Sequence, residues 1–423
     1  MGNFGFIMIG VVDVIVAGRH STNTLAAISI ATAITSCIMM FGIGILVNIC
    51  PILSNYRGER KSTTEYFYPS LKFAMALGCI TSLIILGMIP LIDKIGYEIG
   101  LSSIIKDYFF ITAFATFGAY LHCMTKEYLQ SFEIVVFPNI VTILAVFLNL
   151  FLNIILVFGF WKIPALGAIG LAIASLAVRY FMGLVLLVYC FIINKVDKES
   201  RENGINIAFY KDLIKIGLPA SCAIMIEFIA FNIVTVIMGR VNGIYAAAHN
   251  LICTLTSVSF MVPLAISNAA AVKVGYNNGA KDFDRLKKYA FTSIKASIIF
   301  MACSAAILGL FAAFWVGLFT GDAELIKVCV PIIYILCCFQ IFDGLQVTLS
   351  GIFRGIKSTK IVMLSNLISY WFIAFPLGCI LAFKFRFNLI GFWIAIGFSA
   401  IILCTIMYVI MLKKFNNFTK EVN

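Results

Sequence analysis

The sequence is poor in charged residues. Aspartate, glutamate, lysine and arginine together make up 12% of its 423 residues, whereas hydrophobic residues make up 62%. Apolar blocks recur along the whole chain, and about 20 apolar residues in a helix match a hydrocarbon core about 30 Å thick. A soluble globular protein would need polar helix faces, which these blocks lack. The composition therefore predicts an all-α polytopic membrane protein.

Motifs for enzymes and bound metals are also missing. The 13 cysteines form no CxxC pair and have no matching histidine spacing, so they are typical of small buried hydrophobic residues rather than of disulfides or zinc ligands. No HExxH, GxSxG or P-loop pattern stands at a helix end. We therefore expect no enzyme activity, no cofactor and no use of ATP.

Basic residues are distributed unevenly between the loops. A net charge of +12 could suggest nucleic-acid binding, but most of the 31 lysines and arginines fall on one side of the predicted membrane segments. This bias follows the positive-inside rule, under which cytoplasmic loops are rich in lysine and arginine. It predicts that both termini are cytoplasmic and that the chain binds the lipid bilayer and no nucleic acid.

Twelve hydrophobic segments are predicted, with one long polar stretch between the sixth and the seventh. That stretch, NKVDKESRENGIN at 194–206, is rich in charge and has no apolar period. We predict an N-terminal six-helix lobe at 1–193, a cytoplasmic linker at 194–209, and a C-terminal six-helix lobe with a short cytoplasmic tail at 210–423. The predicted segments are 1–18, 24–54, 70–91, 105–130, 136–159, 165–193, 210–239, 246–278, 288–318, 325–354, 361–383 and 390–412.

The two halves repeat each other at an offset of 221 residues. Gly18-Arg19 falls on Gly239-Arg240, and Gly58 falls on Gly279. One register held across both halves indicates two lobes of the same topology related by a pseudo-two-fold repeat. The seventh segment starts further back than Met1 allows for the first, so we expect either a native start upstream of Met1 or a truncated first helix.

Three acids lie at membrane depth, and none has an acidic counterpart in the other half: Asp13, Glu227 and Asp343. A charged side chain at the centre of a membrane helix costs roughly 2.5–3.5 kcal/mol, so each of these acids needs a partner, an ion, a proton or an aqueous cavity. Two interpretations stay open. They are ion- or proton-coupling groups, or they serve structure as hydrogen-bonded acids, as a helix cap, or as a partner of Arg179.

Two amides in the fifth segment are candidates for the same cavity. Asn149 and Asn153 stand four residues apart in FLNLFLN, so they share one helical face. They either line the cavity or form hydrogen bonds between helices.

Several stretches together resemble a known family: DVIVAGRHSTNTLAAISI, PILSNYRGE, FLNLFLNIILVFG, IGLPASCAIMIEF, VPLAISNAAAVKVGYNNGA and FQIFDGLQVTLSGIFRG. The chain resembles the MATE (multidrug and toxic compound extrusion) transporters, with most similarity to the NorM-type branch. The resemblance implies a V-shaped pair of six-helix lobes around a central cavity. It also implies export of organic cations in exchange for sodium ions or protons.

The resemblance assigns roles to individual positions. Glu227 and Asp343 match the acids linked to cation binding and, in this reading, to a sodium ion. Asp13 matches the essential acid of the N-terminal lobe. Phe339 stands where some members have a tyrosine associated with the cation, which is a departure from the family pattern. We expect Phe339 to line the substrate cavity together with Asn149 and Asn153. Two amides match positions near the N-terminal acid: Asn149 and Asn153.

The expected function is therefore a secondary antiporter that exports cationic amphipathic small molecules by alternating access. We expect a monomer in a bacterial inner membrane. The nearest alternative is a flippase of the same superfamily for a lipid-linked saccharide, although such proteins usually line their cavity with basic residues. A membrane-embedded enzyme or a channel is a further alternative.

Overall fold

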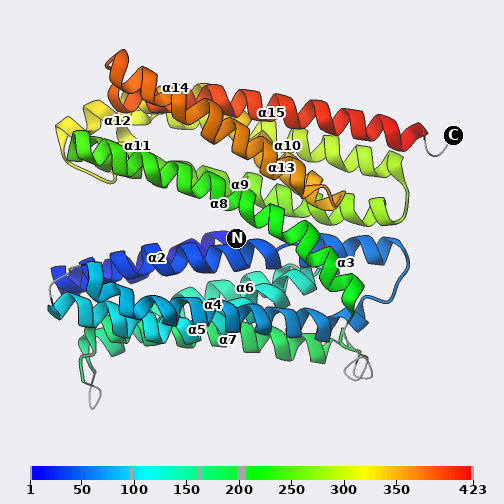
Figure 1. Ribbon diagram of the computed structural model, residues 1–423, viewed down its shortest axis with the longest axis horizontal. Helices are drawn as coiled ribbons and strands as arrows, with labels where there is room; N and C mark the ends of the chain where they lie inside the picture. Colours follow the sequence, from blue (N-terminus) through cyan, green and yellow to red (C-terminus); the bar gives the residue numbers. More distant parts are fainter. Residues whose placement is uncertain (1, 96–98, 161–163, 194, 198–205, 421–423) are drawn as a thin grey trace. The chain divides into compact units, whose positions relative to one another are not determined.

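The computed structural model describes residues 2–95, 99–160, 164–193, 195–197 and 206–420. Within these ranges the chain folds into helices and contains no β-strand (Figure 1). Among the residues so described, 11 helical stretches are long and apolar enough to cross a membrane, and the α1 helix (Gly2–His20) precedes them. These observations confirm the predicted all-α membrane fold.

The helices match the predicted segments closely. In the first half they are α1, α2 (Thr22–Leu46), α3 (Ile49–Gly58), α4 (Phe67–Ile95), α5 (Ile99–Ser131), α6 (Val136–Phe158) and α7 (Gly167–Ile192), with a short 3-10 turn, η1 (Thr64–Tyr66), before α4. In the second half they are α8 (Ile207–Val241), α9 (Gly243–Gly279), α10 (Phe283–Leu310), α11 (Ala312–Gly317), α12 (Ala323–Gly355), α13 (Thr359–Asn366), η3 (Leu367–Ala374), α14 (Phe375–Cys379), η4 (Ile380–Lys384) and α15 (Asn388–Lys420).

The chain divides into two compact units. Unit 1 comprises Met1–Leu53 and Ser62–Ser221, and unit 2 comprises Ser54–Lys61 and Cys222–Asn423. The predicted linker falls largely on residues 194 and 198–205, which lie outside the described residues. The predicted lobe boundaries at 193 and 210 therefore stay a prediction.

In unit 1, α5 is the helix on which most others pack. It lies along α4 and α7 and also contacts α2, while α6 packs against α1 and α7 (Figure 1). The hydroxyl of Tyr120 on α5 lies 3.0 Å from that of Thr81 on α4 and donates to the Met39 carbonyl of α2 at 3.3 Å. One buried side chain thus joins three membrane helices.

In unit 2, α9 and α12 lie side by side, with α10 against both and α15 against α12 (Figure 1). Two apolar clusters fill the spaces between these helices, one containing Trp393 and Phe392 and the other containing Phe353 and Met407. The close packing of these large side chains helps to hold the helices of unit 2 together through van der Waals contacts.

The repeat predicted from the sequence is visible in the helix starts. Ser21 precedes α2 and accepts a hydrogen bond from the backbone N–H of Thr24 at 3.0 Å. Asn242, the residue at the same place in the repeat, precedes α9 and accepts one from the N–H of Ile244 at 2.9 Å. Both side chains satisfy backbone donors that a helix start leaves unpaired. The two units therefore begin corresponding helices in the same register.

Gly351 sets the closeness of α9 and α12, and this predicts a stability effect. A Cβ at Gly351 would overlap the backbone carbonyl of Ser267 on α9. We expect Gly351→Ala to reduce the free energy of unfolding by about 1–3 kcal/mol, as overpacking in a tight interior does. Unfolding of the purified protein in detergent measures this.

Gly87 on α4 provides the matched control, because a Cβ there would meet no atom within 4 Å. Gly87→Ala should change stability by less than about 1 kcal/mol, in the stabilising direction, since alanine favours a helix over glycine. Equal unfolding midpoints for both variants would contradict the close-packing explanation.

Candidate functional site

The first candidate site lies in unit 1, around Asp13 on α1. Three side chains donate hydrogen bonds to its carboxylate. Asn153 Nδ2 donates to Oδ1 at 2.7 Å, Asn149 Nδ2 donates to Oδ1 at 3.1 Å, and Ser175 Oγ of α7 donates to Oδ2 at 2.9 Å. The two amides are fully buried, whereas the acid is half-buried. Asp13 is thus held between α6 and α7.

The positions of the two amides follow from the geometry of α6. Residues four apart lie one above the other on a helix, and Asn153 Nδ2 also lies 3.2 Å from Asn149 Oδ1. The structure therefore brings Asp13, Asn149 and Asn153 together. The bonds from these amides on α6 to Asp13 on α1 are hydrogen bonds between helices, and the predicted place of the amides in a cavity stays a prediction.

Arg179 is a second charged group in this part of unit 1. It lies one helical turn after Ser175 on α7, and its Nη1 donates to the thioether sulfur of Met39 at 3.5 Å. Its charge acts electrostatically on Asp13. A thioether is a weak acceptor for a guanidinium. At membrane depth, unit 1 therefore contains an acid that accepts three side-chain hydrogen bonds, Asp13, and a base whose hydrogen bond to a thioether is weak, Arg179.

The second candidate site lies in unit 2, around Glu227 on α8. Both carboxylate oxygens have a donor from another helix. Tyr370 Oη of η3 donates to Oε1 at 3.2 Å, and Gln346 Nε2 of α12 donates to Oε2 at 3.3 Å. Gln346 and Tyr370 are also within 3.2 Å of each other, and both are buried. These three side chains form a closed hydrogen-bonded triangle.

Asp343 lies beside this triangle on α12, three residues before Gln346. Its negative charge acts on both Glu227 and Tyr370. Asp343 is only half-buried, and among the residues that the structure describes it accepts no hydrogen bond. The structure thus brings two of the predicted acids into one site, one with a donor at each oxygen and one with no hydrogen bond among the described residues.

An unusual helix form places Tyr370 at the site. Residues Leu367–Ala374 form a π-helix, a form that often occurs at functional sites. Trp371 Nε1 donates to the Ile226 carbonyl and Asn366 Nδ2 donates to the Ala223 carbonyl, each at 3.2 Å. These bonds fix the π-helical segment to α8, so that the hydroxyl of Tyr370 meets Glu227.

Phe339, the predicted cavity residue, lies in the apolar core. It is one turn before Asp343 on α12, but only 6% of its surface is exposed. Its ring stacks on Trp393 with a centroid separation of 6.4 Å and packs against Gly397. Its observed contacts are those of a core residue.

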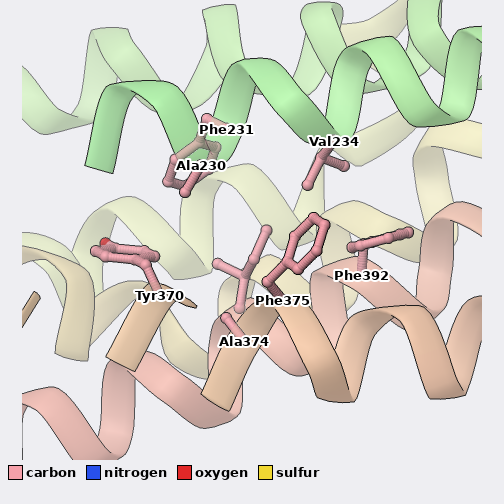
Figure 2. Close-up of a pocket in the computed structure, with 8 residues that line it drawn as sticks. Ala230, Phe231, Val234, Tyr370, Ala374, Phe375 and Phe392 are labelled. Atoms are coloured by element: carbon pink, nitrogen blue, oxygen red, sulfur yellow. The ribbon is translucent and has the colours of Figure 1, made fainter. Parts of the chain in front are cut away.

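A small apolar hollow adjoins the unit 2 site. Tyr370 forms one wall, and Phe231 of α8 and Phe375 of α14 face it from other sides (Figure 2). Its volume, ≈ 10 Å³, is about that needed for one water molecule and far below that of a drug pocket. The complete lining is Ala230, Phe231, Val234, Tyr370, Ala374, Phe375, Phe392 and Ile396.

Three residues of these sites were not predicted: Ser175, Gln346 and Tyr370. Gln346 carried a usable signal, because a polar residue three positions from Asp343 lies near the same helical face. Ser175 carried a weaker one, one turn before Arg179. Nothing in the sequence pointed to Tyr370, because its direction depends on the π-helix.

Comparison with known proteins places the chain in a family. A family model described as MatE matches residues 1–155 and 219–380, which include all three membrane acids. The chain belongs to the MatE family. This MatE protein is accordingly an integral membrane protein and a secondary transporter, not an enzyme, and the predicted family is confirmed.

Curated relatives of this MatE protein are similar over nearly its full length. It is 27% identical over 416 residues to the probable multidrug resistance protein NorM of Photorhabdus laumondii, covering 95% of this chain and 90% of the relative. It is 28% identical over 428 residues to the protein of the same name from Agrobacterium fabrum, covering 95% and 89%.

Solved structures agree with the fold. A crystal structure of MATE in the bent conformation matches with a TM-score of 0.91 at 17% identity, covering 99% of this chain and 94% of the other. An outward-facing multidrug resistance MATE family transporter of the MOP superfamily matches with a TM-score of 0.88 at 17% identity, covering 99% and 93%. The fold of this MatE protein is therefore that of the solved MATE transporters.

Proposed function

We propose that the protein is a multidrug antiporter that exports organic cations in exchange for sodium ions or protons, by alternating access. The observation that carries the proposal is the pair of acids in unit 2. Glu227 is held by two donors, while Asp343 beside it is half-exposed and has no donor among the described residues. An unpaired carboxylate at membrane depth is costly unless a cation or a proton neutralises it.

Either coupling ion suits the chemistry of the donor set. Hard cations prefer oxygen ligands, and the carboxylates of Glu227 and Asp343, the amide oxygen of Gln346 and the hydroxyl of Tyr370 supply oxygens at one place. A proton needs one carboxylate oxygen alone. When either ion leaves, the site regains negative charge and can attract an organic cation.

The names of the relatives support the substrate class. Curated relatives from several bacteria are called multidrug resistance proteins, which favours small-molecule substrates of varied structure. Acids inside an apolar membrane domain favour cationic amphipathic molecules over anions. We also propose a monomer in the bacterial inner membrane with both termini cytoplasmic, as the distribution of lysine and arginine predicts.

Transport in proteoliposomes tests the proposal. The vesicles carry a fluorescent organic cation such as ethidium, with either a sodium gradient or a pH gradient imposed. We expect one of the two to drive accumulation against the concentration gradient. A potential of 100 mV supplies about 2.3 kcal/mol per coupled charge, which corresponds to a roughly 50-fold concentration ratio. Folded protein that moves no organic cation under either gradient would refute the antiporter.

A further inference from the structure

The carboxylate of Asp13 can accept one hydrogen bond more than it does. Its Oδ1 accepts bonds from Asn149 and Asn153, and its Oδ2 accepts one from Ser175 at 2.9 Å. The two oxygens of a carboxylate together offer about four acceptor positions. Among the described residues no other donor reaches Asp13, so Oδ2 has room for one further partner beside Ser175.

Arg179 stands one helical turn after Ser175 on α7. Side chains of an α-helix lean towards its N-terminal end, and residues four apart have Cβ atoms roughly 5–6 Å apart. The backbone of α7 therefore directs the arginine side chain towards Ser175, whose hydroxyl is bonded to Asp13. The charges of Asp13 and Arg179 both act on Tyr108, a buried residue of α5, so the acid and the base belong to one polar region of unit 1.

The bond that Arg179 makes in this structure is a weak one. Its Nη1 donates to the thioether sulfur of Met39 on α2 at 3.5 Å, and it has no other hydrogen bond and no ion pair among the described residues. A guanidinium has five N–H donors and bonds a carboxylate strongly, whereas a thioether is a weak acceptor. By turning from Met39 to Asp13, the guanidinium would exchange a weak acceptor for a strong one.

We propose that Arg179 competes with the exported organic cation for the carboxylate of Asp13, and that it releases the cation by taking its place. The inference rests on the proposed function, in which acids at membrane depth bind an organic cation. The guanidinium and the organic cation exclude each other at Oδ2, because two positive charges repel and this oxygen can accept only one further bond. With the cation bound, Arg179 stays on the sulfur of Met39.

Binding of ethidium to the purified, full-length protein in detergent tests the competition. Arg179→Gln removes the competing charge, so the Kd for ethidium should fall about five-fold, at the low end of measured couplings between sites. Arg179→Lys keeps the positive charge and should restore most of the wild-type Kd. Fluorescence anisotropy of ethidium measures all three proteins. An unchanged Kd in Arg179→Gln would overturn the inference.

Met39→Leu should shift the Kd in the opposite direction. Leucine has a similar volume but no acceptor, so the guanidinium is no longer held away from Asp13, and the Kd for ethidium should rise. The neighbouring Met40→Leu, at an exposed methionine of α2, is the matched control. Arg19→Gln, at an exposed arginine in the last turn of α1, is the control for the loss of one positive charge. Both controls should keep the wild-type Kd.

Export kinetics in proteoliposomes separate release from a structural role. If Arg179 releases the cation, Arg179→Gln should lower KM and kcat together, because the cation binds more tightly and leaves more slowly. A variant that is merely less stable would lose rate without tighter binding. A fall in kcat with an unchanged KM would therefore count against the competition.

A double-mutant cycle with Asp13 decides whether the two positive charges meet at this acid. In the Asp13→Asn background, Arg179→Gln should leave the Kd for ethidium unchanged. The same fall in Kd with and without the acid would show a general repulsion of cations by Arg179 and would overturn the competition. Should Asp13→Asn bind no ethidium, Met39→Leu decides, since only a competing guanidinium raises its Kd. Wild-type protein that exports no organic cation under either gradient refutes the proposed function, whereas the Kd comparison judges Arg179 separately.

Discussion

Replacement of Asp343 by asparagine is expected to abolish export of organic cations while leaving the protein folded. The substitution removes one negative charge and preserves the shape of the side chain. Because Asp343 accepts no hydrogen bond among the described residues, the amide breaks no contact that holds α12 in place. The substitution should therefore reduce transport rather than stability. Each charge that moves with the membrane potential supplies about 2.3 kcal/mol per 100 mV to transport.

Ethidium efflux from cells with matched expression levels measures this effect. We expect efflux by Asp343→Asn to fall to the level of cells without the transporter, and its unfolding temperature in detergent to remain that of the wild type. Asp107→Asn, at an exposed acid of α5, is the control and should export normally. Wild-type efflux in the Asp343 variant would remove this acid from the coupling mechanism.

The fold could be predicted from the sequence because a membrane helix is recognised by the length of one continuous hydrophobic run. Hydrophobic length alone separates membrane helices from loops, and each predicted segment overlaps an observed helix, although the ends differ by up to eight residues. Divisions inside a segment were not predicted. The break between α2 and α3 falls at Val47 and Asn48, where Asn48 Nδ2 bonds back to the Gly44 carbonyl at 2.8 Å. Pro51, in the first turn of α3, was an unused signal for this break, because a proline lacks the N–H that would bond the Val47 carbonyl four residues back.

The candidate sites were accessible only in part. Acids can be recognised in an apolar membrane helix because burying a charge there costs free energy. The four-residue spacing of Asn149 and Asn153 indicates that they share one helical face. Contacts between distant helices leave no such pattern. Tyr370 is one of 16 tyrosines in the chain, and only the π-helix around it turns its hydroxyl towards Glu227.

The two sites also differ in how fully their acids are bonded. In unit 1, Asp13 receives three hydrogen bonds, whereas in unit 2 Asp343 receives none among the described residues. A carboxylate that accepts several hydrogen bonds from neighbouring helices stabilises the fold, in addition to carrying a negative charge. Substitutions around Asp13 should therefore separate into effects on transport and effects on folding.

Asp13→Asn is expected to stop export, because it removes the one acid of the unit 1 site while keeping a side chain that can still accept from Ser175. Asn153→Leu should instead act on folding. It removes the shortest bond to Asp13, 2.7 Å, and leaves a buried oxygen of Asn149 without its donor, which costs about 1–3 kcal/mol. Unfolding in detergent and ethidium efflux, measured on the same preparations, separate the two effects. Thr142→Val provides the control, since among the described residues this buried hydroxyl of α6 bonds only within its own helix, to the Pro138 carbonyl at 2.9 Å. Efflux by Asp13→Asn at the wild-type rate would show that the unit 1 acid serves structure alone, and coupling would then belong to Glu227 and Asp343.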